Sequence, residues 1–385
     1  METRALRKNG EKFSLLGFGC MRLPLLEGSQ EIDVPRATEM VDYALSQGVN
    51  YFDTAYMYHE GKSEAFIGGA LARHPRDSFK IATKLPPWMV ESEADIDRIF
   101  DEQLARCKVS YFDNYLIHNV SRSKLDRIRK FNIIAKLNEK KRQGLIGSLG
   151  FSFHDGPSTL EVMVKENDWD FAQIQLNYLD WEVQEAKELY RILSDNNLQA
   201  IIMEPVRGGA LATLSESAVD ILKKADPTAS VPSWAIRFAA SLPDVLTVLS
   251  GMSDMEQLKD NVSTMKRFSP ITPAEQETID LALDAYRRSG AVPCTACGYC
   301  MDCPSGVDIP KVFAIYNGYR TTQVANTFLL HLGVLGEEKQ PKNCIGCGEC
   351  LPKCPQQLNI PDLMENVAGK AAELSSGEMP PWAKV

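Results

Sequence analysis

The sequence predicts an α/β protein in which a (β/α)8 TIM barrel is followed by a small, mainly α-helical domain. Eight short apolar runs, rich in β-forming residues, alternate with segments of helical periodicity through about the first three quarters of the chain. Eight of the ten cysteines lie in two short runs in the last quarter. A doubly wound sheet usually has about five or six strands, so eight repeats favour the closed barrel.

The first element expected is a hairpin, because short apolar-containing segments flank Asn9-Gly10, a favoured two-residue hairpin turn. The eight barrel strands are expected to begin near Phe13, Val49, Phe79, Phe112, Ile146, Phe171, Gln199 and Val245. Helices are expected between them, for example over residues 35–47, 93–107, 124–141, 233–241 and 255–267. Ser63 and Asp254 are interpreted as helix caps.

The barrel is expected to end with a helix over residues 273–288, and Ser289-Gly290 marks the boundary. The predicted domains are therefore a barrel over 1–290, a cysteine-containing domain over 291–373 and a tail over 374–385. Segments 309–319 and 323–332 carry apolar residues on one side, which favours helices rather than hairpins between the cysteine runs. The tail is expected to be either loose or docked through Trp382.

The two cysteine runs carry the most specific signal in the sequence. The second run has the spacing of bacterial ferredoxins with two 4Fe-4S clusters, and the first run is one residue shorter. A proline directly follows each run, and each run ends in a similar segment, which indicates an internal two-fold repeat. The runs consist of Cys294, Cys297, Cys300 and Cys303, and of Cys344, Cys347, Cys350 and Cys354. This pattern predicts a ferredoxin-type domain that carries electrons.

A four-iron cluster needs four thiolates, and three cysteines of one run leave the fourth to the other run, as in two-cluster ferredoxins. We therefore predict one cluster on Cys294, Cys297, Cys300 and Cys354, and the other on Cys344, Cys347, Cys350 and Cys303. Structural zinc usually pairs two short cysteine knuckles across about a dozen or more residues, so zinc is a less favoured alternative, and a disulfide framework is less favoured still. Thiolates that bind iron need a reducing compartment, which predicts the cytoplasm.

Composition narrows the classes of partner. The chain of 385 residues has a formal net charge of -9, with 44% hydrophobic and 24% charged residues. An acidic surface argues against nucleic acid and against an anionic membrane as partners. No run of about eighteen apolar residues is present, so no transmembrane helix is expected. The N-terminal segment lacks the apolar core of a signal peptide.

Four polar residues follow or end successive predicted strands, where barrel enzymes place their catalytic groups. They are Asp53, Tyr58, Lys84 and His118. A buried Lys84 needs an anion, and Asp53 on the adjacent strand is the expected partner. Lys84 is also expected to lower the pKa of Tyr58, which would then donate a proton to a carbonyl oxygen. His118 is expected to hold the same oxygen.

These residues resemble the signature of the aldo-keto reductase superfamily. The matching segment reads Asp53-Thr54-Ala55, then Tyr58, then Gly61 and Ser63-Glu64. The resemblance covers about residues 1–290 and implies an NAD(P)H-dependent carbonyl reductase, with Tyr58 as general acid and Asp53, Lys84 and His118 in support. The family binds its nicotinamide cofactor extended across the barrel mouth, without a glycine-rich phosphate loop.

The resemblance also implies a set of cofactor-binding residues: Ser152, Gln173, Asn177, Pro205, Gly209, Ser250, Gly251, Met252, Ser253, Gln257 and Asn261. Backbone N–H groups at the start of the helix after Ser253 suit a phosphate. Gln257 stands where NADPH-specific members often carry an arginine, so the sequence leaves NADPH and NADH open. Arg207 is expected either to compensate for that arginine or to be a solvated loop residue.

The sequence thus favours an oxidoreductase that reduces a small-molecule carbonyl or redox substrate. Hydride transfer moves two electrons and each cluster carries one, and no flavin motif is visible to convert between them. The clusters therefore either serve a separate flavoprotein or other electron-transfer partner, or reduce a molecule at the barrel mouth, or are mainly structural. The alternative function is a redox-sensing or electron-transfer subunit in which the barrel is a binding scaffold.

Overall fold

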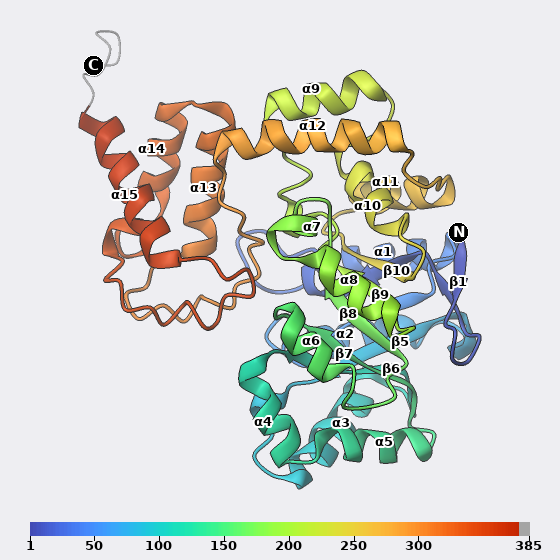
Figure 1. Cartoon of the computed structure of the whole chain (residues 1–385). Helices are drawn as coiled ribbons and strands as arrows, with labels where there is room; N and C mark the ends of the chain where they lie inside the picture. Colours follow the sequence, from blue (N-terminus) through green and yellow to red (C-terminus); the bar gives the residue numbers. More distant parts are fainter. Residues whose placement is uncertain (377–385) are drawn as a thin grey trace. The chain divides into compact units, whose positions relative to one another are not determined.

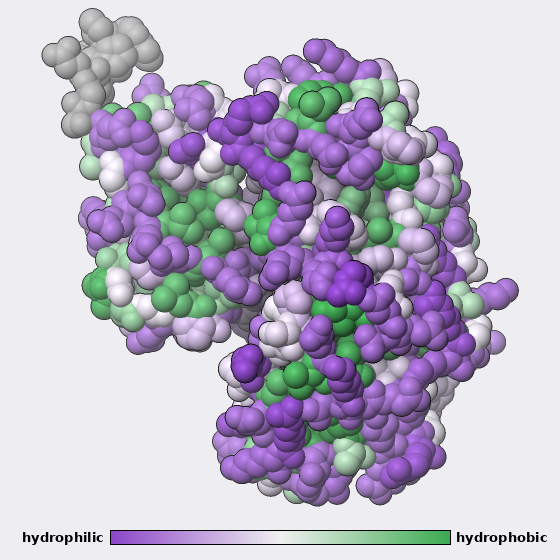
Figure 2. Space-filling view, viewed as in Figure 1, coloured by the Kyte–Doolittle hydropathy of each residue, from purple (hydrophilic) through white to green (hydrophobic). Residues whose placement is uncertain are grey.

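A computed structural model describes residues 1–376 of the chain (Figure 1). The contacts divide it into two compact units. The barrel unit comprises Met1–Val206 and Pro232–Ile271, and the cysteine unit comprises Arg207–Val231 and the described residues from 272 onward. Hydrophilic side chains cover most of the surface visible in Figure 2, as the acidic composition leads one to expect.

The barrel unit contains a closed sheet of eight parallel strands, so the predicted (β/α)8 barrel is confirmed. Neighbouring strands follow chain order around the barrel, and the last strand pairs with the first. The strands are β3 (Leu16–Gly19), β4 (Tyr51–Asp53), β5 (Lys80–Leu85), β6 (Phe112–Val120), β7 (Ile146–Phe153), β8 (Phe171–Gln175), β9 (Gln199–Met203) and β10 (Val245–Gly251). Their carboxyl ends therefore meet at one mouth, where polar side chains can converge.

The predicted N-terminal hairpin is present, formed by β1 (Thr3–Ala5) and β2 (Lys12–Ser14) in antiparallel pairing. The expected two-residue turn is wrong: strand pairing ends at Ala5 and Lys12, and a longer turn contains Gly10 with φ +74°. Leu6 and Phe13 are completely buried in one core cluster with residues at the start of several barrel strands. The run expected near Phe13 thus divides between this hairpin and β3.

Helices surround the barrel as the periodicity predicts. They are α1 (Val34–Ser46), α2 (Ser63–Leu71), α3 (Glu93–Cys107), α4 (Arg122–Lys130), α5 (Ile133–Arg142), α6 (Pro157–Met163), α7 (Asp180–Val183), α8 (Ala186–Asp195), α10 (Val231–Ala240) and α11 (Met255–Lys266). The single helix expected over 124–141 is wrong, because Asn132 adopts a left-handed conformation, with φ +51°, between α4 and α5. Asparagine tolerates this conformation better than most residues. Asp254 caps α11 as predicted, by accepting a hydrogen bond from the Gln257 backbone N–H.

The described residues of the cysteine unit form helices joined by loops, with no strand, as expected. Its helices are α9 (Glu216–Ala225), α12 (Pro273–Ser289), α13 (Ile309–Thr322), α14 (Ala325–Val334) and α15 (Ile360–Ser376). α13, α14 and α15 share a core that includes Phe313, Phe328 and Met364. Gly290 ends α12 in a left-handed conformation, with φ +67°.

Two helices that the sequence assigns to the barrel domain, α9 and α12, pack against each other and belong to the cysteine unit. The predicted domain limits at 290 and 373 stay predictions. The expected tail, with Trp382, lies outside the described residues beyond 376. Within residues 1–376, none of the helices combines the length and apolar character that a membrane span requires.

Candidate functional site

The barrel brings three of the four predicted catalytic residues to the carboxyl ends of consecutive strands. Asp53 is the last residue of β4, Lys84 lies near the end of β5, and His118 lies near the end of β6. β4 pairs with β5 and β5 pairs with β6 in parallel register. Tyr58 follows β4 by five residues in the loop before α2.

Lys84 is the centre of this constellation. Its Nζ donates to Oδ1 of Asp53 at 2.6 Å and to the backbone oxygen of Thr54 at 2.7 Å, and lies 3.4 Å from the Tyr58 hydroxyl. The Lys84 side chain is fully buried and that of Asp53 is nearly so. Removing one partner of such a buried pair typically costs about 3–5 kcal/mol, because the other charge stays buried without compensation.

His118 is the fourth residue of the set, and its ring lies near those of Tyr58 and Trp88. Its ring centre lies 5.9 Å from that of Tyr58, with the two planes at 82°, and 5.3 Å from that of Trp88. Nδ1 of His118 has no hydrogen-bond partner among residues 1–376. Burial, helped by the positive charge of Lys84, holds the pKa of His118 well below its usual value. The neutral imidazole therefore has one N–H to donate near neutral pH.

The pKa of Tyr58 differs from the sequence expectation. Burial raises this pKa well above 10, and the negative charges of Asp53 and Glu204 raise it further. The expected net lowering is wrong because burial outweighs the charge of Lys84, which Asp53 at 2.6 Å partly compensates. The phenol is consequently protonated across the neutral range, which is the state a proton donor needs.

The sequence did not indicate a buried hydrogen-bond network that contacts the backbone of Lys84. Glu64 is fully buried and accepts hydrogen bonds from Thr83 at 2.6 Å and from Nε2 of Gln103 at 2.7 Å. The same Gln103 nitrogen donates to the backbone oxygen of Lys84 at 3.0 Å. Burial raises the pKa of Glu64. The prediction that Ser63 caps α2 is wrong, since its hydroxyl instead bonds to the Thr54 hydroxyl and to the backbone oxygen of Cys20.

Four non-glycine residues with left-handed backbone lie where the barrel mouth is built. Residues with left-handed backbone follow Tyr58, His118 and β9 directly; they are His59, Glu60, Asn119 and Glu204. Such conformations cost non-glycine residues about 1–3 kcal/mol each and tend to cluster at functional sites. This strain thus lies at the same end of the barrel as the four polar residues.

The residues expected to hold the nicotinamide differ in their free polar groups. Ser152 and Gln173 are buried near the ends of β7 and in β8, and Oε1 of Gln173 meets no donor within the described part of the chain. Gln173 therefore fits a carboxamide partner. Asn177 is engaged by its own chain, since its side chain bonds to Leu179, Asp180 and Glu204.

The segment expected to hold the adenosine half begins at the end of β10. Ser250 and Gly251 end this strand, Met252 is buried, and Asn261 Nδ2 donates to the Ser250 hydroxyl at 3.0 Å. At the start of α11, the Gln257 side chain accepts from the Ser253 backbone N–H at 2.9 Å and donates to Asp254. The N–H groups expected to bind phosphate are thus partly engaged, and Asp254 adds a negative charge there.

Pro205, Arg207 and Gly209 belong to the segment that follows β9 in the chain. Pro205 lies in the barrel unit, whereas Arg207 and Gly209 belong to the cysteine unit. Arg207 is neither a solvated loop residue nor exposed toward a 2′-phosphate: it is completely buried. Its Nη2 donates to the backbone oxygen of Pro293 at 2.9 Å and to Oε1 of Gln356 at 3.0 Å. Burial lowers the pKa of Arg207 to about 10, so it stays charged at neutral pH.

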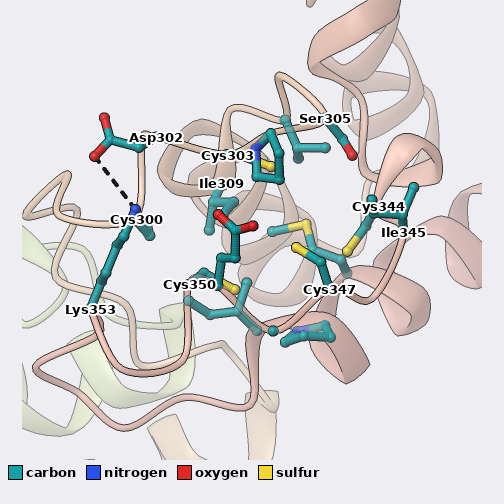
Figure 3. Close-up of a pocket in the computed structure, with 17 residues that line it drawn as sticks. Cys300, Asp302, Cys303, Ser305, Ile309, Cys344, Ile345, Cys347, Cys350 and Lys353 are labelled. Carbon is teal, nitrogen blue, oxygen red and sulfur yellow. Dashed lines mark hydrogen bonds and ion pairs between the residues drawn. The ribbon is translucent and has the colours of Figure 1, made fainter.

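The eight clustered cysteines line two cavities in the arrangement predicted from their spacing. Cys294, Cys297, Cys300 and Cys354 line the first cavity. Cys303, Cys344, Cys347 and Cys350 line the second (Figure 3). Cys300 borders both. Each cavity thus takes its fourth thiol from the other run.

The backbone repeats the same turns in both cysteine runs. Left-handed residues, with φ between 52° and 79°, occur at matching positions: Ala296 and Gly346, Gly298 and Gly348, Gly306 and Gln357. The backbone N–H groups of Gly306 and Gln357 donate to Cys303 and Cys354 at 3.0 and 3.1 Å. The last turn is therefore the same in both runs, although the first run is one residue shorter.

The donor set of each cavity fits a four-iron cluster, because four thiols can supply one thiolate to each iron. The Ala296 N–H donates to Sγ of Cys294 at 3.3 Å. N–H donors to sulfur are among the groups that set cluster potentials.

Comparison with known proteins places both parts of the chain. Residues 15–284 match the aldo/keto reductase family, and residues 293–358 match the 4Fe-4S dicluster domain. The uncharacterized oxidoreductase YqkF of Bacillus subtilis is 25% identical over 68% of this chain and 90% of its own length. The L-galactose dehydrogenase of Arabidopsis thaliana is 26% identical over 72% and 92%, respectively.

Among solved structures, the aldo-keto reductase AKR11C1 from Bacillus halodurans, in its holo form, is similar with a TM-score of 0.62 and 26% identity. The match covers 73% of this chain and 96% of that protein. The family match spans most of the chain and agrees with the parallel barrel and its polar mouth. The chain is therefore a member of the aldo/keto reductase family, an oxidoreductase whose barrel is followed by a 4Fe-4S dicluster domain.

Proposed function

We propose that the barrel reduces a carbonyl compound with NAD(P)H and that Tyr58 is the general acid. The observation that carries the proposal is the contact of Lys84 with both Asp53 and the Tyr58 hydroxyl. A bound nicotinamide would supply hydride to the carbonyl carbon. Ser152 and Gln173 are the residues we propose to hold its carboxamide, and Gln173 Oε1 is available for that bond among the described residues.

The side chains of the site divide the remaining work. Tyr58 donates its phenolic proton to the carbonyl oxygen, and Lys84, fixed by Asp53 and Thr54, stabilises the phenolate that remains. His118 is neutral and donates one N–H to the same oxygen, which fixes the orientation of the carbonyl. The buried network of Glu64 and Gln103 holds the backbone at Lys84 in place.

For the cysteine unit we propose two 4Fe-4S clusters, which supply one-electron transfer. Cys294, Cys297, Cys300 and Cys354 would hold the first cluster, and Cys344, Cys347, Cys350 and Cys303 the second. The second set is the more open to solvent: Cys347 is exposed, and the neighbouring Ile345 is 72% exposed. This exposure supports electron exchange with an external carrier, such as a flavoprotein, in a cytoplasmic setting that keeps the thiols reduced.

The activity is tested by mixing anaerobically purified protein with NADPH or NADH and a panel of aldehydes and ketones. The expected result is a substrate-dependent fall in nicotinamide absorbance with at least one cofactor. Tight nicotinamide binding without turnover of any carbonyl would support the alternative, in which the barrel is a binding scaffold for a redox sensor or electron-transfer subunit. A comparison of the two cofactors decides the preference that Gln257 leaves open.

The charges near His118 lead to a prediction about substrate class. Lys124, in the first turn of α4, donates to the Asn119 backbone oxygen at 2.7 Å, and its Nζ lies 5.5 Å from the Trp88 ring centre. Burial lowers the pKa of Lys124 to about 8, against the opposing influence of Asp155. Lys124 and Lys84 both contribute positive charge near His118. We therefore expect a preference for carbonyl substrates that carry a carboxylate.

Lys124→Met should lower kcat/KM for a carboxylate-bearing aldehyde about tenfold, the size of one lost charge-assisted contact, and leave its uncharged ester nearly unchanged. Lys130→Met, an exposed change on the same helix, is the control. In the wild-type protein the preference for the acid over the ester should decline as pH rises through about 8, because the lysine then loses its proton. Equal effects on acid and ester would exclude this role.

A further inference from the structure

Arg207 joins the two chain segments that build the first cysteine cavity. Its guanidinium donates to the backbone oxygen of Pro293, the residue before Cys294, and to the side chain of Gln356, two residues after Cys354. Both segments line that cavity. The arginine is completely buried, which is rare for arginine unless it is paired, as it is here with Pro293 and Gln356.

The neighbouring glycine shows how closely this loop is fitted to the first cysteine run. A Cβ atom at Gly208 would lie 2.2 Å from the backbone oxygen of Thr295, which no side chain can satisfy without moving the backbone. Gly208 has φ +62° and Arg207 has φ +49°, so both residues are left-handed. A strained arginine conformation beside an obligatory glycine indicates that the guanidinium is held in place by the fold.

The charges around the two cavities are unequal. Of the described residues that line the first cavity, none is Asp or Glu, and the buried Arg207 interacts electrostatically with Cys294 and Cys354. Asp302, Glu349 and Lys353 line the second cavity, and Lys353 lies 3.5 Å from Asp302 (Figure 3). The lysine charge there is thus partly compensated and partly solvated.

We propose that Arg207 is a positioning and tuning residue that raises the reduction potential of the cluster on Cys294, Cys297, Cys300 and Cys354, and of that cluster selectively. Reduction adds one electron, and therefore one negative charge, to the cluster. A buried cation close to the thiolates stabilises that charge, since charge and burial are among the factors that set cluster potentials. The proposal rests on the two clusters of the proposed function, but not on carbonyl reduction.

The test is a redox titration of the whole protein, followed by electron paramagnetic resonance, after iron content has been measured. Arg207→Met and Arg207→Gln remove the charge, and Arg207→Lys keeps it. Arg320→Met is the matched control, because Arg320 also donates to a backbone oxygen of this unit, that of Ser289, at 2.7 Å. Solvent at the exposed Cys347 also favours reduction of the second cluster, so the wild-type potentials alone do not report the effect of Arg207.

In Arg207→Met and Arg207→Gln, one of the two midpoint potentials should become more negative by at least about 59 mV, which is a tenfold change in a one-electron equilibrium. The other midpoint potential should keep its wild-type value. Arg207→Lys and Arg320→Met should leave both potentials near the wild-type values. Equal shifts of both clusters, or no shift, would overturn the proposal. Loss of about four irons in both uncharged variants would also overturn it, because Arg207 would then be structural. A wild-type protein without iron would instead refute the proposed clusters.

Discussion

Tyr58→Phe should reduce carbonyl turnover by at least about 100-fold, because a positioned general acid typically contributes about 10²- to 10⁴-fold. The phenylalanine ring keeps the packing against His118 but has no proton to donate. Nicotinamide binding should stay within a few-fold of wild type, because the Tyr58 hydroxyl is directed to Lys84. Steady-state kinetics and a fluorescence titration of the cofactor measure the two effects separately.

Tyr56→Phe is the matched control for this variant. The Tyr56 hydroxyl donates to Glu102 of α3 at 2.7 Å, and its ring packs against Arg106, so the same atom is removed two residues away. Turnover by the control should remain close to wild type. Unchanged turnover in Tyr58→Phe, or an equal loss in both variants, would contradict the assignment of Tyr58 as the proton donor.

The second large effect concerns which cysteines bind each of the two clusters. In the crossed arrangement, Cys294 and Cys354 serve the same cluster, so changing both to serine should remove one cluster and leave about four of about eight irons. Cys294 and Cys303 serve different clusters, so the double change of that pair should damage both. Iron analysis and electron paramagnetic resonance of anaerobically prepared protein measure the outcome.

These two double variants share Cys294→Ser and differ only in the second cysteine, so each controls for the other. If each run held its own cluster, the results would be reversed: the pair 294 and 303 would leave about four irons, and the pair 294 and 354 would damage both clusters. Such a reversal would contradict the crossed assignment. That assignment is based on the four thiols that line each cavity.

Much of the fold could be predicted from the sequence because it depends on local patterns. Alternation of apolar runs with helical periodicity gives the eight-stranded barrel, and the parallel sheet then places the ends of β4, β5 and β6 together. The Lys84–Asp53 contact follows, since a buried lysine needs an anion. The predicted set of four cysteines lines each cavity, although Cys300 borders both.

Features that depend on tertiary packing could not be predicted in this way. The break at Asn132 interrupts no apolar periodicity, since Ile128 and Ile133 are buried on either side of it. The pKa of Tyr58 depends on how burial balances a paired charge, which only the structure gives. Arg207 is a polar residue in a glycine-containing loop, and nothing in its local sequence indicates complete burial against Pro293 and Gln356.

The most direct test of hydride transfer in the barrel uses NADPH or NADH in which both hydrogens on C4 of the nicotinamide are replaced by deuterium. The reaction is run with a reducible carbonyl in ordinary water. Direct transfer predicts one deuterium per product molecule, bound to the former carbonyl carbon, and a slower reaction than with the undeuterated cofactor in a single turnover. Product that contains no deuterium would contradict direct transfer, because the hydrogen on carbon would then have come from solvent after electron transfer through the clusters.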